Sequence, residues 1–441
     1  MDFFLVITTL TVLVASILFD WWYFLKLRSK RLPPGPSPWP IVGAIPYVVS
    51  VRHETSTKKM SQSLQSKYGK ILTVWLGKTP MIFIHDPELT YDALVKQGAY
   101  FSNRAKNSSM GIISSGWRTV GTSEGPWTVA LRKNVMTHML GPSRLKAFKP
   151  LRDRAYGDIV NDLRSVAAAA EDGVAQVNLR SVVVNRVLRF VLVLTFGVEL
   201  EENLIQEILL NLGERFRLGD ESITGGNYCE TLFQLEKEFP DFNNSVITSL
   251  CAEFLNTAFF TATLAIDHTM ALLCDHPVVN EKLYQEIEAV VGRRAVDESD
   301  LPNLPYLSAV VRESLRVWKF GLMSLPHATS ELRKLGGYDI PTDAVVFFVL
   351  ESFHLDPTYW SEPSVFKPER FLENDLDVLG TKNFSFLPFS AGRRVCPGSQ
   401  LGMLQISVVV ACLVQTFEWE KVLNVKNPEI GTVLRARPRS V

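Results

Sequence analysis

The chain has 441 residues, of which 46% are hydrophobic and 10% aromatic, so it is long enough to bury a large core. Its 46 basic and 46 acidic residues give a formal net charge of +0, which argues against a nucleic-acid partner. The five cysteines are scattered, without the spacing of a zinc site or a disulfide framework. These features predict a globular protein of a reducing compartment.

The chain begins with an apolar run that has a basic flank. Phe3–Phe19 is uncharged and mostly apolar, at the short end of what spans a bilayer. Aromatic residues and then four basic residues follow it, namely Lys26, Arg28, Lys30 and Arg31. Positive charge after the run predicts a single-pass anchor over residues 1–25 with the remainder cytoplasmic. A cleaved signal peptide is the alternative, but it needs basic residues before the run.

Residues 26–40 form a basic, proline-rich hinge, and residues 41–441 form the predicted catalytic domain. Lys70–Ile84 reads as a hairpin that turns at Gly77-Lys78. Apolar periodicity predicts helices at Thr57–Tyr68, Pro87–Gln97, 125–136, Leu145–Ala170, Val182–Phe196, Glu202–Phe216, Val246–Cys274, Leu304–Trp318 and Gln400–Phe417. We therefore expect a mainly α fold with a minor antiparallel β-sheet.

Cys396 follows a glycine-bearing loop and precedes the last apolar helix. The positive N-terminus of that helix and the N–H groups of the loop favour a thiolate. A thiolate held in this way can be the axial ligand of a haem iron. In this interpretation Phe389 shields the sulfur, Gly392 lets the loop approach the flat ring, and Arg394 reaches a haem propionate. The alternative is a buried structural cysteine beside surface arginines.

The pattern F-x-x-G-x-R-x-C-x-G is formed by Phe389, Gly392, Arg394, Cys396 and Gly398. It resembles the haem-binding loop of the cytochrome P-450 superfamily, and the anchor and hinge resemble those of plant-type microsomal members. The resemblance implies the cytochrome P-450 fold, haem b (iron protoporphyrin IX) and Cys396 as its axial ligand.

The same resemblance implies further propionate partners. Arg132 matches the arginine of the family's propionate-binding helix, whereas Trp127 lies five residues before it, where the family has four. Trp127 is therefore rotated by about 100° from the expected face, which leaves ordinary packing open. His327 matches a position that bonds a propionate from a strand. Arg104 is another possible partner, or a solvated arginine.

The long helix Val246–Cys274 resembles the oxygen-side helix of the family. Thr261 matches the threonine that assists oxygen activation, but Phe260 replaces the acidic residue before it. A phenyl ring cannot relay a proton. We therefore expect slow or uncoupled monooxygenation, or a reaction that needs no protonation of O₂. A core threonine bonded within its own helix is the alternative for Thr261.

Glu313 and Arg316 stand at E-x-x-R spacing, which places both on one face of a helix. With Arg370 they resemble a buried salt-bridge cluster of the family. Because a buried cluster is costly unless every partner is present, we expect a structural rather than a catalytic role.

By comparison with the family, part of the helices that roof the substrate pocket is missing near Gly219–Asn244, and the C-terminus is changed. The resemblance implies an endoplasmic reticulum monooxygenase that inserts one oxygen atom into an apolar small molecule, which we expect to be a fatty acid. NADPH-cytochrome P-450 reductase would supply the electrons. The alternatives are a reductase-independent haem-thiolate isomerase or dehydratase, and a catalytically impaired haem-binding isoform.

Overall fold

The computed structural model describes residues 2–28, 31–39, 42–44, 57–106, 108–199, 227–236, 238–239, 241–318, 323–374, 376–380, 383–422 and 432–439. The chain forms two compact units, each of which is described by itself. The first unit comprises Met1–Ala105, Lys319–Pro363 and Asp377–Val395. The second comprises Lys106–Trp318, Ser364–Leu376 and Cys396–Val441, so the chain changes unit within the cysteine loop.

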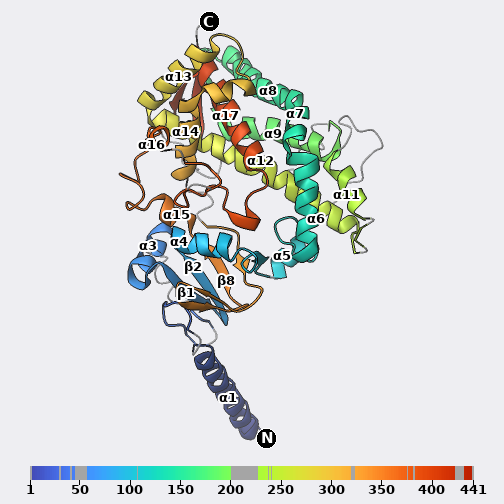
Figure 1. The fold of residues 1–441 in the computed structure, drawn as a ribbon, viewed down its shortest axis with the longest axis vertical. Coiled ribbons are helices and arrows are strands. Elements are labelled where there is room, and N and C mark those ends of the chain that lie inside the picture. Colours follow the sequence, from blue (N-terminus) through green and yellow to red (C-terminus); the bar gives the residue numbers. More distant parts are fainter. Residues whose placement is uncertain are drawn as a thin grey trace. The chain divides into compact units, whose positions relative to one another are not determined.

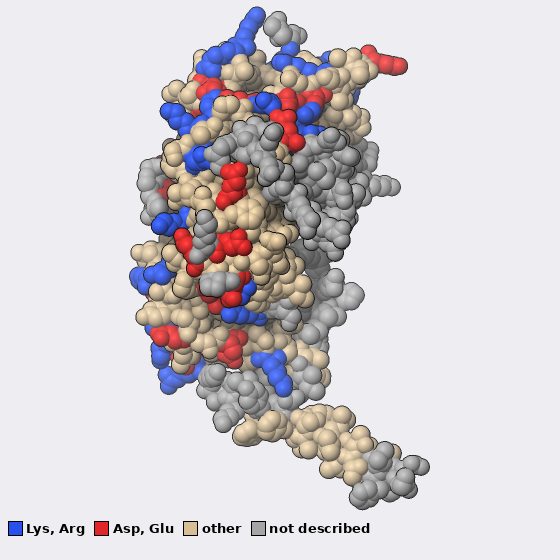
Figure 2. All heavy atoms as spheres, turned by 90° about the vertical axis from the view of Figure 1, so that its right-hand side faces the viewer, with Lys and Arg blue, Asp and Glu red and all other residues tan. Residues whose placement is uncertain are grey.

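The first unit begins with helix α1 (Asp2–Arg28). Its side chains from Val6 to Phe19 are all exposed and uncharged, and Figure 2 shows the described part of this helix without charged atoms. The other helical segments of this unit are short. They are α3 (Thr57–Tyr68), α4 (Pro87–Tyr91), the π-helical turn η1 (Asp92–Lys96), α15 (Leu350–His354) and the 3₁₀ turn η4 (Gly392–Arg394).

A five-stranded sheet carries the core of the first unit (Figure 1). Its strand order is β1 (Ile71–Leu76), β2 (Thr79–Ile84), β8 (Val345–Phe348), β5 (His327–Ala328) and β3 (Asn103–Arg104). The β2–β8 pair is parallel and the others are antiparallel, so the sheet is mixed rather than purely antiparallel. A separate hairpin joins β6 (Arg333–Leu335) to β7 (Tyr338–Ile340). Apolar side chains of β2, β8, η1 and α15 pack into one cluster.

The second unit is mainly helical. Among the residues that the structure describes, its helices are α5 (Ser108–Ile113), α6 (Gly125–Val135), η2 (Met136–Leu140), α7 (Pro142–Ala147), α8 (Lys149–Ala169), α9 (Leu179–Phe196), α11 (Tyr228–Glu236), α12 (Asn244–Asp275), α13 (Pro277–Val291), η3 (Glu298–Asn303), α14 (Pro305–Arg316), α16 (Arg370–Glu373) and α17 (Ser399–Thr416). A small antiparallel sheet has the order β4 (Ala175–Asn178), β10 (Val433–Pro438) and β9 (Phe417–Lys421).

Helix α12 is the centre of the second unit, where it packs against α9 and α17. At 32 residues it is about 48 Å long. The Asn243 side chain caps it by accepting a hydrogen bond from the Val246 N–H. Helices α12 and α17 are long and apolar enough to cross a membrane, yet more than half of each apolar window is buried within the protein. Both are therefore core helices of this unit.

The predicted helices within the described residues are present, with shifted ends. The predicted helix Leu145–Ala170 is two helices, α7 and α8, and Pro150 occupies the first turn of α8, where its missing N–H costs no bond. The sequence does not predict α11, which lies in the polar stretch where roof helices were expected to be missing. The predicted helix Glu202–Phe216, and with it residues 219–226 of that stretch, lies outside the described residues.

Candidate functional site

Cys396 lies in the second unit, just before the first turn of α17. The residue as a whole is exposed. The protein around its thiol is nevertheless dense, and this burial raises the pKa of the thiol. Two groups act in the opposite direction: the Gly398 N–H donates a hydrogen bond to the sulfur, and the Arg132 guanidinium attracts the thiolate charge. This polarity suits a sulfur that becomes a thiolate when it binds a metal.

Arg132 comes from α6 in the same unit. Burial lowers the pKa of Arg132, and the negative form of Cys396 raises it. The structure therefore brings together two of the predicted haem-binding residues, which are far apart in the sequence. A half-buried guanidinium beside this cysteine can hold an anionic group.

The first unit gathers a second set of basic groups. Arg104 on β3 is the direct cross-strand partner of His327 on β5, and both side chains are buried. Arg394 is also buried, and its Nε donates to the Ser102 carbonyl at 2.7 Å. Burial, together with the charges of Arg104 and Arg394, lowers the pKa of His327 to about 3. Such a concentration of positive charge favours an anion.

The hydrogen bond of His327 limits what this side chain can do. Its Nδ1 lies 2.7 Å from the Phe101 carbonyl, which can only accept, so Nδ1 carries the proton. The neutral ring then presents Nε2 as an acceptor rather than a donor. In this state a carboxylate finds its donors on Arg104 and Arg394, not on His327.

Gly392 is required by a close backbone contact within the first unit. Its φ of +70° lies in the left-handed region, and a Cβ at this position would collide with the Leu94 carbonyl on η1. The glycine therefore lets the cysteine loop touch η1, a reason that the sequence did not suggest. Phe389, from the same loop, is half-buried.

Thr261 lies on the exposed part of α12, where its Oγ1 donates to the Thr257 carbonyl at 2.9 Å. Phe260 beside it is 43% exposed and contacts Phe259 edge to face. The hydroxyl and the phenyl ring are therefore both accessible on this helix, and no carboxylate stands at position 260 to exchange protons with solvent.

Trp127 packs among aromatic residues of the second unit. Its ring stacks on Phe242, with centroids 5.5 Å apart, and lies 4.7 Å from Phe239. The Arg118 guanidinium lies 5.6 Å from the same ring. Thr128, the next residue, donates to the Ser123 carbonyl at 2.5 Å. These contacts match the packing alternative for Trp127.

The structure brings Glu313, Arg316 and Arg370 together in the second unit, all buried. Arg316 binds both carboxylate oxygens of Glu313, and Arg370 binds one of them. The backbone N–H of Lys367 donates to the same carboxylate at 2.9 Å. A buried carboxylate with this many donors fixes α14 to the chain around α16.

Glu253 is a polar residue that sequence reasoning missed. From α12 its two oxygens accept hydrogen bonds from the N–H groups of Val120 and Gly121, at 2.8 and 2.9 Å. This carboxylate anchors the loop that precedes α6, the helix that carries Arg132. No spacing in the sequence indicates it, because the two contacting segments are more than 130 residues apart.

A family model, that of cytochrome P450, matches residues 33–223 and 227–440. The chain belongs to the cytochrome P450 family. Cytochrome P450 98A1 of Sorghum bicolor is 30% identical over 89% of this P450 and 86% of the relative. The alignment has 447 positions, whereas only 89% of this 441-residue chain takes part in it. The relative therefore has residues within the aligned region that this chain lacks.

Flavonoid 3'-monooxygenase of Arabidopsis thaliana is 29% identical over 93% of this P450 and 90% of the relative. A zebra fish cytochrome P450 solved with abiraterone has the same fold, with a TM-score of 0.72, 20% identity, and coverage of 87% of this chain and 99% of the other. The solved structure confirms the fold, and the family model and the relatives confirm the enzyme class, a haem-dependent P450 monooxygenase.

The residues described above fit haem. Cys396 offers a sulfur ligand with its charge partly compensated by Gly398 and Arg132, and the basic groups of each unit suit carboxylates.

Proposed function

We propose that this P450 is anchored in the endoplasmic reticulum membrane and inserts one atom of O₂ into an apolar small molecule. The observation that carries the proposal is the place of Cys396 before α17. Burial raises the pKa of its thiol, and the Gly398 N–H and the Arg132 guanidinium act in the opposite direction by stabilising a thiolate. When bound, haem supplies the oxygen chemistry, and the protein supplies the ligand, the pocket and the protons.

Each proposed haem-holding residue acts within its own unit. In the second unit Cys396 is the axial ligand, Gly398 supports its sulfur and Arg132 holds a propionate. In the first unit Arg104 and Arg394 hold a propionate, while His327 keeps the strand pair in place through its bond to Phe101. Trp127 supports α6 through its aromatic contacts.

Thr261 is proposed to hold, at Oγ1, the proton that oxygen activation consumes. Its present acceptor is the Thr257 carbonyl, so the hydroxyl must turn from that carbonyl to donate elsewhere. Phe260 cannot resupply the proton, since a phenyl ring carries no exchangeable hydrogen. We therefore infer that this chain loses part of its reducing equivalents as hydrogen peroxide.

The anchor and the partners follow from other features. Helix α1 exposes an uncharged apolar surface from Val6 to Phe19, which suits a bilayer. We propose NADPH-cytochrome P-450 reductase as the electron donor. For the substrate we propose an apolar small molecule. The segments SLC-x-EFLN and LKAFKPLR favour a fatty acid, whereas two relatives are named for a flavonoid and for ent-isokaurene.

The absorption spectrum of the purified full chain, reduced and treated with carbon monoxide, tests the site. We expect a strongly red-shifted Soret band that is lost in Cys396→Ala. If the wild type and Cys396→Ala both bind haem and give the same spectrum, Cys396 is not the ligand. With haem and reductase present, apolar substrates are then screened for NADPH-dependent oxygenated products.

Phe260 favours a second candidate reaction, the rearrangement of a fatty-acid hydroperoxide without a reductase, because that reaction needs no protons delivered to O₂. The hydroxyl of Thr261 argues against it. Turnover of linoleate hydroperoxide by the haem-loaded chain alone would support this candidate. Product formed only with NADPH and reductase would reject it.

A further inference from the structure

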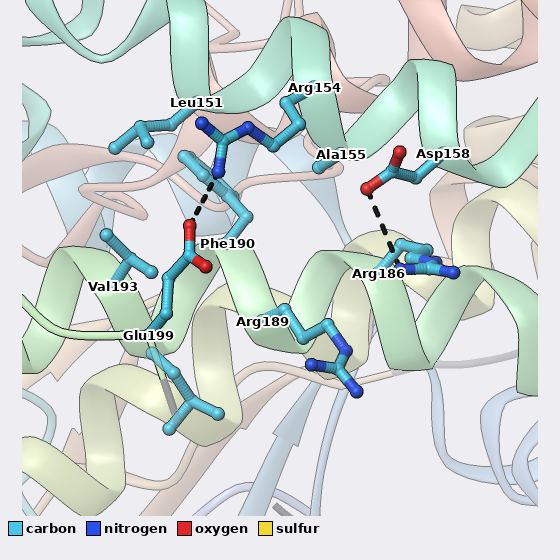
Figure 3. Close-up of a pocket in the computed structure, with 10 residues that line it drawn as sticks. Leu151, Arg154, Ala155, Asp158, Arg186, Arg189, Phe190, Val193 and Glu199 are labelled. Atoms are coloured by element: carbon cyan, nitrogen blue, oxygen red, sulfur yellow. Dashed lines mark hydrogen bonds and ion pairs between the residues drawn. The ribbon is translucent and has the colours of Figure 1, made fainter. Parts of the chain in front are cut away.

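A hollow between α8 and α9 in the second unit shares no residue with the groups described above. It has a volume of about 150 Å³. Its floor is formed by the apolar side chains of Ala155, Phe190 and Val193, each of which is at most 7% exposed. Figure 3 shows charged side chains around it, with Arg154 facing Glu199 on one side and Arg186 facing Asp158 on the other. An apolar floor under a charged rim suits an amphipathic ligand.

Three arginines line the hollow. Arg189 donates to the Asn185 side chain at 2.9 Å, and the other two are held by carboxylates to different degrees. Arg186 makes two hydrogen bonds to Asp162, at 2.6 and 2.7 Å, and these bonds raise the pKa of Arg186. Arg154 contacts Glu199 through a single bond of 2.5 Å, and the two side chains are 64% and 62% exposed. Exposed pairs of this kind contribute little to stability. An incoming carboxylate can therefore replace Glu199 at little cost.

We propose that this hollow binds a small monocarboxylic acid whose apolar body is about the size of a benzene ring. Its carboxylate pairs with Arg154 in place of Glu199, and its apolar body packs on Ala155, Phe190 and Val193. The size follows from the volume, since a cavity of ~150 Å³ accommodates benzene. A single negative charge matches the lining, where three arginines and two carboxylates leave a net charge of +1. Glu199 then competes with the ligand's carboxylate for Arg154 and weakens binding of the ligand.

Isothermal titration calorimetry of the haem-loaded full chain tests the proposal, with phenylacetate as the probe and phenylacetamide as its neutral counterpart. We expect one phenylacetate per chain and weaker binding of the amide. Arg154→Gln should weaken binding severalfold, as expected for the loss of an ion pair at an exposed side chain. Glu199→Gln should tighten it severalfold. Arg164→Gln, an exposed arginine farther along α8, should leave it unchanged.

The Soret spectrum is recorded during each titration, because the probe can also enter the haem side of the protein. Binding that shifts the Soret band and is the same in Arg154→Gln as in the wild type would overturn the proposal. Absence of binding in both the wild type and Glu199→Gln at millimolar phenylacetate would do so as well. Neither result bears on Cys396, so this proposal and the proposed function fail separately.

Discussion

The Arg316 guanidinium donates two hydrogen bonds to the Glu313 carboxylate, at 2.7 and 2.8 Å, and both side chains are fully enclosed. Arg370 adds a third bond at 3.0 Å. The Val365 carbonyl accepts from both arginines, at 3.3 and 3.2 Å. The Glu313 carboxylate therefore binds both buried arginines.

The first prediction follows from these ion pairs. Glu313→Gln leaves two buried guanidinium groups without their carboxylate, which should destabilise the fold by about 3–5 kcal/mol. The urea midpoint of the haem-loaded chain measures the effect. Glu373→Gln, an exposed carboxylate on α16, is the matched control and should change the midpoint little. Equal midpoints for the two variants would contradict a structural role for the cluster.

The second prediction compares two glycine substitutions. Gly392→Ala places a Cβ against the Leu94 carbonyl at a φ of +70°, so the loop must move and the yield of haem-loaded protein should fall. Gly157→Ala adds a methyl group on an exposed part of α8 with nothing within 4 Å, and should stabilise by up to about 1 kcal/mol. Full haem loading of Gly392→Ala would show that the loop tolerates displacement.

A third prediction concerns Arg132. Arg132→Leu removes the charge that lowers the pKa of the Cys396 thiol, together with a proposed propionate partner. Haem should leave the protein about tenfold faster, or more, than from the wild type, as judged by transfer to excess apomyoglobin. Lys133→Leu, the exposed neighbour on α6, should release haem at the wild-type rate. Identical rates in all three proteins would remove Arg132 from the haem site.

The fourth prediction tests the consequence of Phe260. Phe260→Glu supplies a titratable group beside Thr261, and its exposure leaves room for the side chain. Proton delivery by a positioned acid contributes on the order of 10²-fold or more, so oxygenated product per NADPH should rise and peroxide should fall. Phe260→Gln introduces a side chain of the same shape as Glu but without a titratable proton. It should not change the yield of product per NADPH. Gains of equal size in both variants would indicate a steric cause.

The fifth prediction is a pH dependence. Burial lowers the pKa of His85 to about 4, so the native chain keeps this imidazole neutral while the unfolded chain takes up a proton near pH 6.5. The unfolded state binds more protons between these values, and the free energy of unfolding should fall with decreasing pH by up to about 1.4 kcal/mol per unit. His85→Gln should reduce the slope without abolishing it, because His327 is also kept neutral by burial, with a pKa of about 3, and contributes in the same way. Urea denaturation at pH 5 and 7 measures the difference.

The cysteine loop was predictable because its chemistry lies within ten residues of sequence. The pairing of Glu313 with Arg316 was also predictable, since residues three apart share a helical face. Arg370, by contrast, was found through resemblance alone. It lies 57 residues after Glu313, and the chain between them must turn back to bring the two side chains together.

The interactions that the sequence did not reveal are all non-local. The bonds of Glu253 to Val120 and Gly121 cross more than 130 residues. The tautomer of His327 depends on the Phe101 carbonyl, 226 residues away. Its neutral state depends on burial, on its strand partner Arg104 and on Arg394 of the cysteine loop. Periodicity reports which face of an element is buried, but not which partner covers that face.

The parallel pairing of β2 with β8 places Met81 opposite Val345. This pairing limits the order in which parts of the protein can fold while the chain is being synthesised. The β1–β2 hairpin can form soon after it leaves the ribosome, but its free edge stays unpaired until the last quarter of the chain has been made. During that interval the second unit, most of which is translated in between, can collapse on its own. Nascent chains should therefore need protection of this strand edge, and ribosome stalling before residue 345 should leave the hairpin sensitive to protease.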